Sequence, residues 1–368
     1  MRLPTSLAVS TLLLMAASGQ AAAQAGEQAP DANPTPEVVV DGTRRPELKS
    51  YRVMSAGLDA FDEHRKLAPT GSLKFRLLQN GAPYGEPQKW DSVTLRLAGD
   101  ELSIPLPIEA DGTFTLPRSQ AAYDEDADLV LNRKKSTISY YVKVLTPGLA
   151  DNVRRMGDLR LQCEVTIAIG KKELNFAQRA FYNTVLLGGD WCSSRKATFG
   201  LLLDDWPMTV TLVDKNTRKA LRAGGYRIVT PIQDSSLSDE ALITFEYWSQ
   251  ASAERKREFL ATTPIFLKSS VFKWNAGTPF REVEKGRYVA RVELSRGESK
   301  LRLESADGQL ALGAPARGDT RIDAGSATKL KYHGGRMVIQ ADQAGAYEVS
   351  LDLRDPDHPE MAISRAET

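Results

Sequence analysis

Residues 264–314 read PIFLKSSVFKWNAGTPFREVEKGRYVARVELSRGESKLRLESADGQLALGA, and short apolar segments alternate there with charged residues. From Tyr288 to Leu294 an apolar side chain recurs at every second position, with Arg291 and Glu293 between them. This alternation is typical of a strand with one buried face and one solvated face. Turns that contain glycine separate the strand from its neighbours. We therefore predict a β-sandwich in the C-terminal hundred residues.

The same region resembles the immunoglobulin-like sandwich modules of pullulanases and of bacterial outer-membrane starch-binding proteins. The resemblance rests on the segments Phe266–Asn275, Gly286–Leu294 and Leu301–Gly308, and on the closing segment Gly345–Asp352. Most of these positions are structural, so the resemblance implies a fold more directly than a ligand.

The candidate ligand-binding residues follow from that resemblance. Trp274 corresponds to a Trp of these modules, and an exposed indole in a loop at the end of a sandwich would stack on a sugar ring. The modules often carry another aromatic residue after a Ser/Asp turn, where this chain has Gly308 and Gln309. The alternative for Trp274 is a place in the core. The candidate set is Trp274, Lys273, Asn275, Phe272 and Tyr332.

The N-terminus has the pattern of an export signal. A basic residue, Arg2, precedes an apolar run and then a group of small residues that ends near Ala25. We interpret residues 1–25 as a secretory signal peptide and residues 26–46 as a flexible linker rich in Pro, Ala and Glu. We expect no transmembrane segment elsewhere and a periplasmic or secreted protein.

Within that linker the segment Glu37–Arg44 reads EVVVDGTR. It resembles the N-terminal segment of TonB-dependent outer-membrane receptors, which binds a periplasmic partner by strand addition, and three consecutive valines favour that mode. The alternatives are a short edge strand and a disordered linker.

One helix is predicted before the β-rich regions and one between two of them. Apolar residues at helical spacing between Tyr51 and Phe61 indicate a helix over Pro46–Lys66, with Pro46 in its first turn. A second, linking helix is predicted over Ser249–Leu260, with Ser249 as its N-cap.

Strand patterns dominate from Ser72 to Tyr247. We expect one sandwich near residues 70–147 and a second, less regular unit near 155–248. Leu159–Ile169 is interpreted as a strand of that second unit, and Phe176–Leu187 as a helix.

Composition and residue chemistry narrow the functional classes. Formal net charge is +1, so nucleic acid is not an expected partner. Basic pairs such as Arg154-Arg155 are interpreted as solvated surface. Asp124, Asp126 and Asp128 lack the Gly and Glu that complete a calcium loop, so we predict no metal and no cofactor. The three scattered histidines give no support for nucleophilic catalysis.

Cys163 and Cys192 are the only two cysteines. In an exported protein an even number of cysteines favours a disulfide over two buried thiols.

These observations predict a mainly all-β chain of tandem β-sandwich domains, with a short N-terminal helix and a linking helix. The predicted divisions are a signal peptide at 1–25, a linker at 26–46, a helix with the first sandwich at 47–150, a second β-rich unit at 151–248, the linking helix at 249–263 and the immunoglobulin-like sandwich at 264–368. We expect a non-enzymatic protein of the bacterial envelope that binds α-glucan or a related saccharide. The alternative is a periplasmic scaffold or assembly protein that binds protein partners, with a link to the TonB system. The sequence leaves the oligomeric state open.

Overall fold

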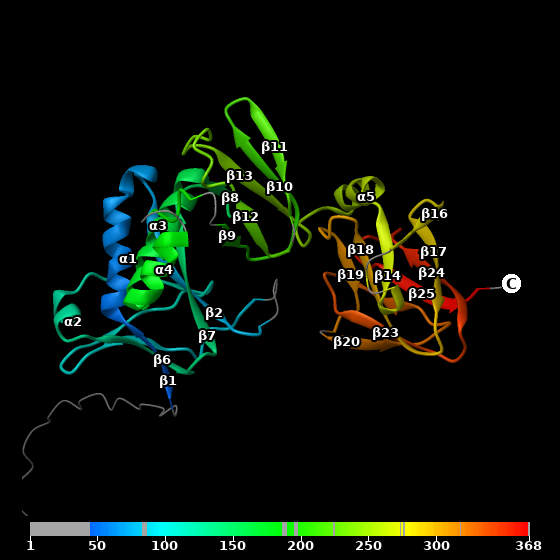
Figure 1. Cartoon of the computed structure of the whole chain (residues 1–368), viewed down its shortest axis with the longest axis horizontal. Helices are drawn as coiled ribbons and strands as arrows, with labels where there is room; N and C mark the ends of the chain where they lie inside the picture. Colours follow the sequence, from blue (N-terminus) through cyan, green and yellow to red (C-terminus); the bar gives the residue numbers. More distant parts are fainter. Residues whose placement is uncertain are drawn as a thin grey trace, which may run out of the picture. The chain divides into compact units, whose positions relative to one another are not determined.

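The fold is described from a computed structural model (Figure 1). It describes residues 45–82, 87–185, 190–194, 198–223, 225–272, 274, 277–316 and 318–366. The predicted signal peptide, most of the linker and the segment Glu37–Arg44 lie outside these residues. The described chain is mainly β, as predicted.

The first part of the chain combines two antiparallel sheets with two long helices. One sheet has the order β1-β6-β3-β4, with β1 (Pro46–Ser50), β6 (Asp128–Lys134), β3 (Leu95–Ala98) and β4 (Ser103–Pro105). The other has the order β5-β2-β7, with β5 (Thr113–Phe114), β2 (Ser72–Gln79) and β7 (Ile138–Leu145). Both sheets contribute to one hydrophobic core that also contains apolar side chains of α1 (Tyr51–Glu63) and α3 (Met156–Glu173). The short helices η1 (Arg65–Leu67) and α2 (Gln120–Asp124) complete this part.

The predicted N-terminal helix is correct in part. The helix α1 begins at Tyr51, and Pro46 begins the strand β1 that precedes it. Among the described residues, β1 lies at the edge of its sheet and pairs only with β6. Proline is tolerated at the start of an edge strand because no ladder hydrogen bond from its nitrogen is required there.

The prediction of a strand at Leu159–Ile169 is wrong, because these residues belong to α3. Leu161 and Val165 of α3 pack in the core of the first part, whereas Leu159 and Cys163 pack in a second core. A helix buried on two sides carries more apolar positions than one stripe requires, and here they fall at every second residue from 159 to 165.

The second core belongs to the middle part of the chain. A sheet of order β11-β10-β13-β8 is formed by β11 (Thr217–Leu221), β10 (Pro207–Asp214), β13 (Leu242–Tyr247) and β8 (Val153–Arg155). A separate two-stranded sheet pairs β9 (Phe199–Leu202) with β12 (Arg227–Thr230). The predicted helix appears as α4 (Phe176–Val185). The disulfide between Cys163 and Cys192 is present, with 5.9 Å between the two Cα atoms.

The last part of the chain is the β-sandwich that the opening sequence predicts. Its first sheet contains β15 (Thr278–Pro279), β14 (Ile265–Ser269), β18 (Gly297–Ser305), β19 (Ala311–Gly313), β22 (Lys331–Tyr332), β23 (Arg336–Ala341) and β20 (Asp319–Ile322). The second has the order β16-β17-β24-β25-β21, with β16 (Arg281–Glu284), β17 (Arg287–Leu294), β24 (Gly345–Asp352), β25 (Glu360–Arg365) and β21 (Thr328–Lys329). A one-turn helix, η2 (Ser270–Phe272), follows β14. Apolar residues of both sheets share a single core.

The linking helix α5 (Ala253–Thr262) is capped by Ser252, not by Ser249 as predicted. The Ser252 hydroxyl accepts a hydrogen bond from the Arg255 N–H at 3.2 Å. Ser249 instead donates a hydrogen bond to Asp205. Leu260 of α5 lies in the core of the C-terminal sandwich.

Candidate ligand-binding cavity

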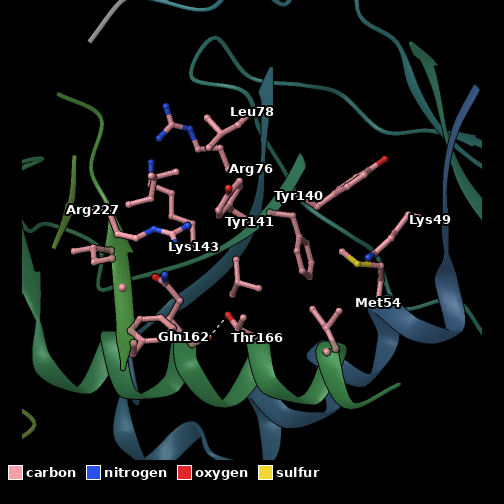
Figure 2. A pocket seen from close by; sticks show the side chains of 18 of the residues that line it. Lys49, Met54, Arg76, Leu78, Tyr140, Tyr141, Lys143, Gln162, Thr166 and Arg227 are labelled. Atoms are coloured by element: carbon pink, nitrogen blue, oxygen red, sulfur yellow. Dashed lines mark hydrogen bonds between the residues drawn. The ribbon is translucent and has the colours of Figure 1, made fainter. Parts of the chain in front are cut away.

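A cavity of about 400 Å³ opens between α3 and the strands β7 and β9 (Figure 2). Its size is within the range of roughly 300–1,000 Å³ that is usual for small-ligand sites. The described residues that line it are Lys49, Met54, Phe75, Arg76, Leu78, Tyr140, Tyr141, Val142, Lys143, Arg154, Gln162, Thr166, Ile169, Gly170, Glu173, Phe199, Gly200, Leu201, Leu202, Asp204 and Arg227.

One wall of the cavity is the open edge of β7. Four consecutive residues, 140–143, line the cavity, although side chains of consecutive strand residues point to opposite faces of a sheet. The strand therefore meets the cavity with its edge, which agrees with its terminal place in the order β5-β2-β7.

Side chains of α3 cover one end of that edge. The Val144 N–H donates to Gln162 Oε1 at 3.3 Å, and the Thr146 N–H donates to Asp158 Oδ2 at 2.8 Å. Outward-directed backbone groups recur at every second residue of an edge strand. The backbone N–H and C=O groups of Tyr140 and Val142 are thus directed toward the cavity.

The opposite wall is also a strand edge. All four residues of β9, Phe199–Leu202, line the cavity. Within the described chain β9 pairs on one side only, with β12. Two strand edges therefore offer backbone donors and acceptors to whatever the cavity holds.

The apolar part of the lining combines aliphatic side chains with four aromatic residues, Phe75, Tyr140, Tyr141 and Phe199. The ring of Tyr140 meets that of Phe114 edge to face, with centroids 6.3 Å apart. The Tyr140 hydroxyl oxygen is buried and has no hydrogen-bond partner among the residues that the structure describes. Burial and the nearby charge of Glu47 raise the pKa of this phenol, so the group remains an available donor.

The charged lining is mainly cationic. Figure 2 shows Arg76, Lys143 and Arg227 toward one end of the cavity and Lys49 toward the other. Arg76 is paired with Asp204, and Lys49 with Glu173. Burial lowers the pKa of the Lys49 ammonium.

Lys143 contacts Asp111 outside the lining, with Nζ 3.1 Å from Oδ2. Burial of the Asp111 carboxylate acts against its charged form. Hydrogen bonds from Thr113 and the charge of Lys143 outweigh this effect and lower the pKa of Asp111 to about 2.

Arg154 and Arg227 lack a carboxylate partner within the described ranges. Arg154 is only 8% exposed, and its Nη1 donates to the carbonyl oxygens of Asp151 and Val153 at 2.7 and 2.8 Å. This burial corrects the interpretation of the Arg154-Arg155 pair as solvated surface. Arg227 lies across Gly200, where an added Cβ would be 2.9 Å from Arg227 Cδ.

The candidate residues from the C-terminal resemblance do not form one site in the described part of the chain. Trp274 is half-buried, has a φ of 65°, and its N–H donates to the Ser269 carbonyl at 3.3 Å. Lys273, Asn275 and the side chain of Phe272 lie outside the described part of the chain.

Tyr332 does not lie beside Trp274 to form a shared aromatic surface. Its ring stacks on Trp248 with centroids 4.1 Å apart, and its hydroxyl donates to the Pro356 carbonyl at 2.8 Å. Burial raises the pKa of this phenol. Tyr332 lies on β22, whereas Trp274 follows β14, and two strands, β18 and β19, lie between them in the sheet order. The ring of Tyr332 therefore packs against the core of the sandwich.

The cavity residues give no local motif from which sequence analysis could have found them. They come from β1, α1, β2, β7, β8, α3, β9, β12 and, for Asp204, the loop after β9, and these segments are dispersed between residues 46 and 230. The one available signal was the basic side chains within otherwise apolar strands, such as Arg76 and Lys143.

Comparisons with known proteins add one weak likeness. No protein-family model matches the chain, and no curated protein matches it. A solved structure entitled "Ligand induced structure of AmyP-SBD" is similar to 29% of this chain and 74% of its own, with 19% identity and a TM-score of 0.25. In the described residues no helix is long and apolar enough to cross a membrane, and no group of metal-ligating side chains comes together.

Proposed function

We propose that this chain is an exported, non-catalytic protein of the bacterial cell envelope that binds a saccharide in the cavity beside β7. The observation that carries the proposal is the pair of strand edges, β7 and β9, that face one cavity with aromatic walls. A polyhydroxylated ligand needs many donors and acceptors, and strand edges provide them in alternation.

The side chains of the lining fit the same ligand class. Gln162 and Thr166 project from α3 into the cavity (Figure 2), and the buried Tyr140 hydroxyl requires a hydrogen-bond partner. Tyrosine rings give flat apolar surfaces that pack on the C–H faces of a sugar while their hydroxyls remain polar.

The carboxylates of the lining support binding rather than catalysis. Glu173 and Asp204 are each held in an ion pair, with Lys49 and Arg76. Glycoside hydrolysis requires two carboxyl groups across one scissile bond, one of them able to give up a proton. A nearby cation stabilises the ionised form of a carboxyl group, so these two groups are poor proton donors. The Cys163–Cys192 disulfide supports export, because disulfides persist in oxidising compartments.

The experiment uses a variant that fills the cavity. Gly170 lines the cavity on α3, and a Cβ added there meets no atom within 4 Å. Gly170→Leu should therefore fold, gain up to about 1 kcal/mol of helix stability and obstruct the ligand. Gly170→Ala is the matched control, because it makes the same backbone change with little added volume.

Calorimetric titration of the protein that begins at residue 26 with neutral and acidic disaccharides tests the proposal. We expect binding to wild type and to Gly170→Ala, and loss of binding in Gly170→Leu. If no disaccharide binds to wild type, or if Gly170→Leu binds as well as Gly170→Ala does, the proposed site is wrong.

A further inference from the structure

We propose that the saccharide of this cavity carries a carboxylate, as a uronic acid does, and that Arg154 and Arg227 bind it. This inference rests on the proposed function and adds the charge of the ligand to it.

The first step is the balance of charge. Among the described residues that line the cavity there are five cationic side chains and two carboxylates. Both carboxylates are engaged by lining cations, and Lys143 is engaged by Asp111 from outside. Arg154 and Arg227 remain without a carboxylate in hydrogen-bond contact among the described residues. The buried Asp158 carboxylate acts on Arg154 electrostatically but does not line the cavity, so the cavity itself keeps an excess of positive charge.

The second step is the burial of Arg154. Its guanidinium is largely removed from water. Among the described residues, only the Nη1 nitrogen of this group donates hydrogen bonds. The partners of Nη1 are carbonyl oxygens, which accept hydrogen bonds without neutralising the charge. A buried guanidinium that contacts only carbonyl oxygens is not neutralised, so a carboxylate bound beside Arg154 gains a charge-assisted hydrogen bond at a site removed from water.

The third step is the placement of Arg227. Gly200 of β9 leaves the space that the Arg227 side chain crosses, and Figure 2 shows Arg227 reaching from β12 toward the interior of the cavity. Any larger residue at position 200 would contact this side chain at 2.9–3.0 Å. The planar guanidinium suits a carboxylate better than an ammonium does, because it offers two parallel N–H donors.

The test compares digalacturonate with its dimethyl ester, which has the same sugar rings but two methyl ester groups in place of the two carboxylates. Titrations with wild-type protein at low and at high salt should show digalacturonate binding at least about tenfold tighter than the ester, as one charge-assisted hydrogen bond implies. The difference should narrow at high salt, because part of the lining is open to solvent.

Arg227→Gln provides the variant test, because Arg227 is exposed and its loss should not unfold the protein. We expect this variant to lose most of the preference for the acid over the ester. Arg321→Gln, on β20 outside the cavity, is the matched control and should keep the wild-type preference.

The outcomes separate the two proposals. Equal binding of acid and ester overturns the inference and leaves saccharide binding in place. A preference for the acid that survives in Arg227→Gln overturns the assigned role of this residue. Failure of both ligands to bind overturns the inference and the proposed function together.

Discussion

The imidazole of His333 lies parallel to the indole of Trp206, with ring centroids 3.9 Å apart and planes inclined by 6°. His333 belongs to the C-terminal sandwich region, and Trp206 directly precedes β10. The His333 Nε2 is buried without a hydrogen-bond partner in the part of the chain that the structure describes. A protonated imidazole in this place would carry an unsatisfied charge away from water.

This burial predicts a loss of stability in mild acid. It lowers the pKa of His333 from 6.5 to about 4. Between these values the unfolded chain binds a proton that the folded chain does not, so the stabilising contribution is complete above pH 6.5 and is lost as pH falls toward 4. The loss should approach about 3 kcal/mol.

Urea unfolding of wild type and His333→Phe at pH 7.0, 5.5 and 4.5 measures this loss. Phenylalanine keeps a flat ring on Trp206 but does not titrate, so the variant should lose less stability in acid than wild type. His358→Gln is the comparison for an exposed histidine. It removes only a surface ion pair with Asp355, so it should change the pH dependence far less than His333→Phe does. Parallel pH profiles for wild type and His333→Phe would contradict the prediction.

A second prediction concerns the start of the C-terminal sandwich. The sequence places its boundary at residue 264, yet Leu260 and Trp248 lie in its core at 5% and 4% exposure. Lys256 of α5 also contacts Asp357, with Nζ 2.5 Å from Oδ1. We therefore expect a fragment of residues 248–368 to unfold cooperatively and to melt at least about 10 °C above a fragment of residues 264–368, because removal of one large core residue costs roughly 2–5 kcal/mol.

Circular dichroism melts of the two fragments decide this. Lys256→Met in the longer fragment is the control for the ion pair alone and should lower its melting temperature less than deletion of α5 does. Equal melting temperatures for the two fragments would show that α5 is dispensable.

A third prediction concerns the disulfide. Cys163 and Cys192 are separated by 29 positions and are both buried. Replacing both by Ser should destabilise the folded protein by about 3 kcal/mol, since the unfolded chain regains the freedom that the cross-link removes. Chemical unfolding of wild type with and without reductant gives the comparison, and the double-Ser variant should not respond to reductant. Two alkylatable thiols in protein purified without reductant would contradict the pairing.

The elements that could be predicted from the sequence are those with one face in the core and the other in solvent. The alternation of Ala290, Arg291, Val292 and Glu293 matches the burial of β17 residue by residue, because β17 has core on one side and solvent on the other. The helix α3 could not be predicted in this way. It is buried against two cores, and the positions that pack in each of them merge into one pattern of period two.

The cavity could not be predicted for a different reason. Its walls are strand edges, and an edge is made of backbone groups that leave no mark in the residue pattern. Arg154 and Arg227 are 73 positions apart, and only the topology brings β8 and β12 to the same cavity. The C-terminal resemblance directed attention to Trp274 instead, and Tyr332 from the same candidate set packs against Trp248.

The last prediction concerns Trp274, whose role as a sugar platform remains open to test. Its φ of 65° is in the left-handed region, which is unfavourable for residues other than Gly by about 1–2 kcal/mol. Trp274→Gly relieves this backbone strain and Trp274→Ala does not, while both remove the indole. We therefore expect Trp274→Gly to melt above Trp274→Ala by an amount that corresponds to about 1 kcal/mol.

Retention on amylose, pullulan and glycogen affinity gels then measures whether the Trp274 indole contributes to saccharide binding. If the indole is a platform, wild type is retarded with an affinity on the order of millimolar, and both variants run unretarded. Trp274→Ala then melts close to wild type, and Trp274→Gly melts above it. If the half-buried ring serves packing, both variants melt below wild type and wild type itself passes the gels unretarded. The second result would leave the cavity beside β7 as the saccharide site to pursue, because Gly170→Leu obstructs it without touching the C-terminal loop.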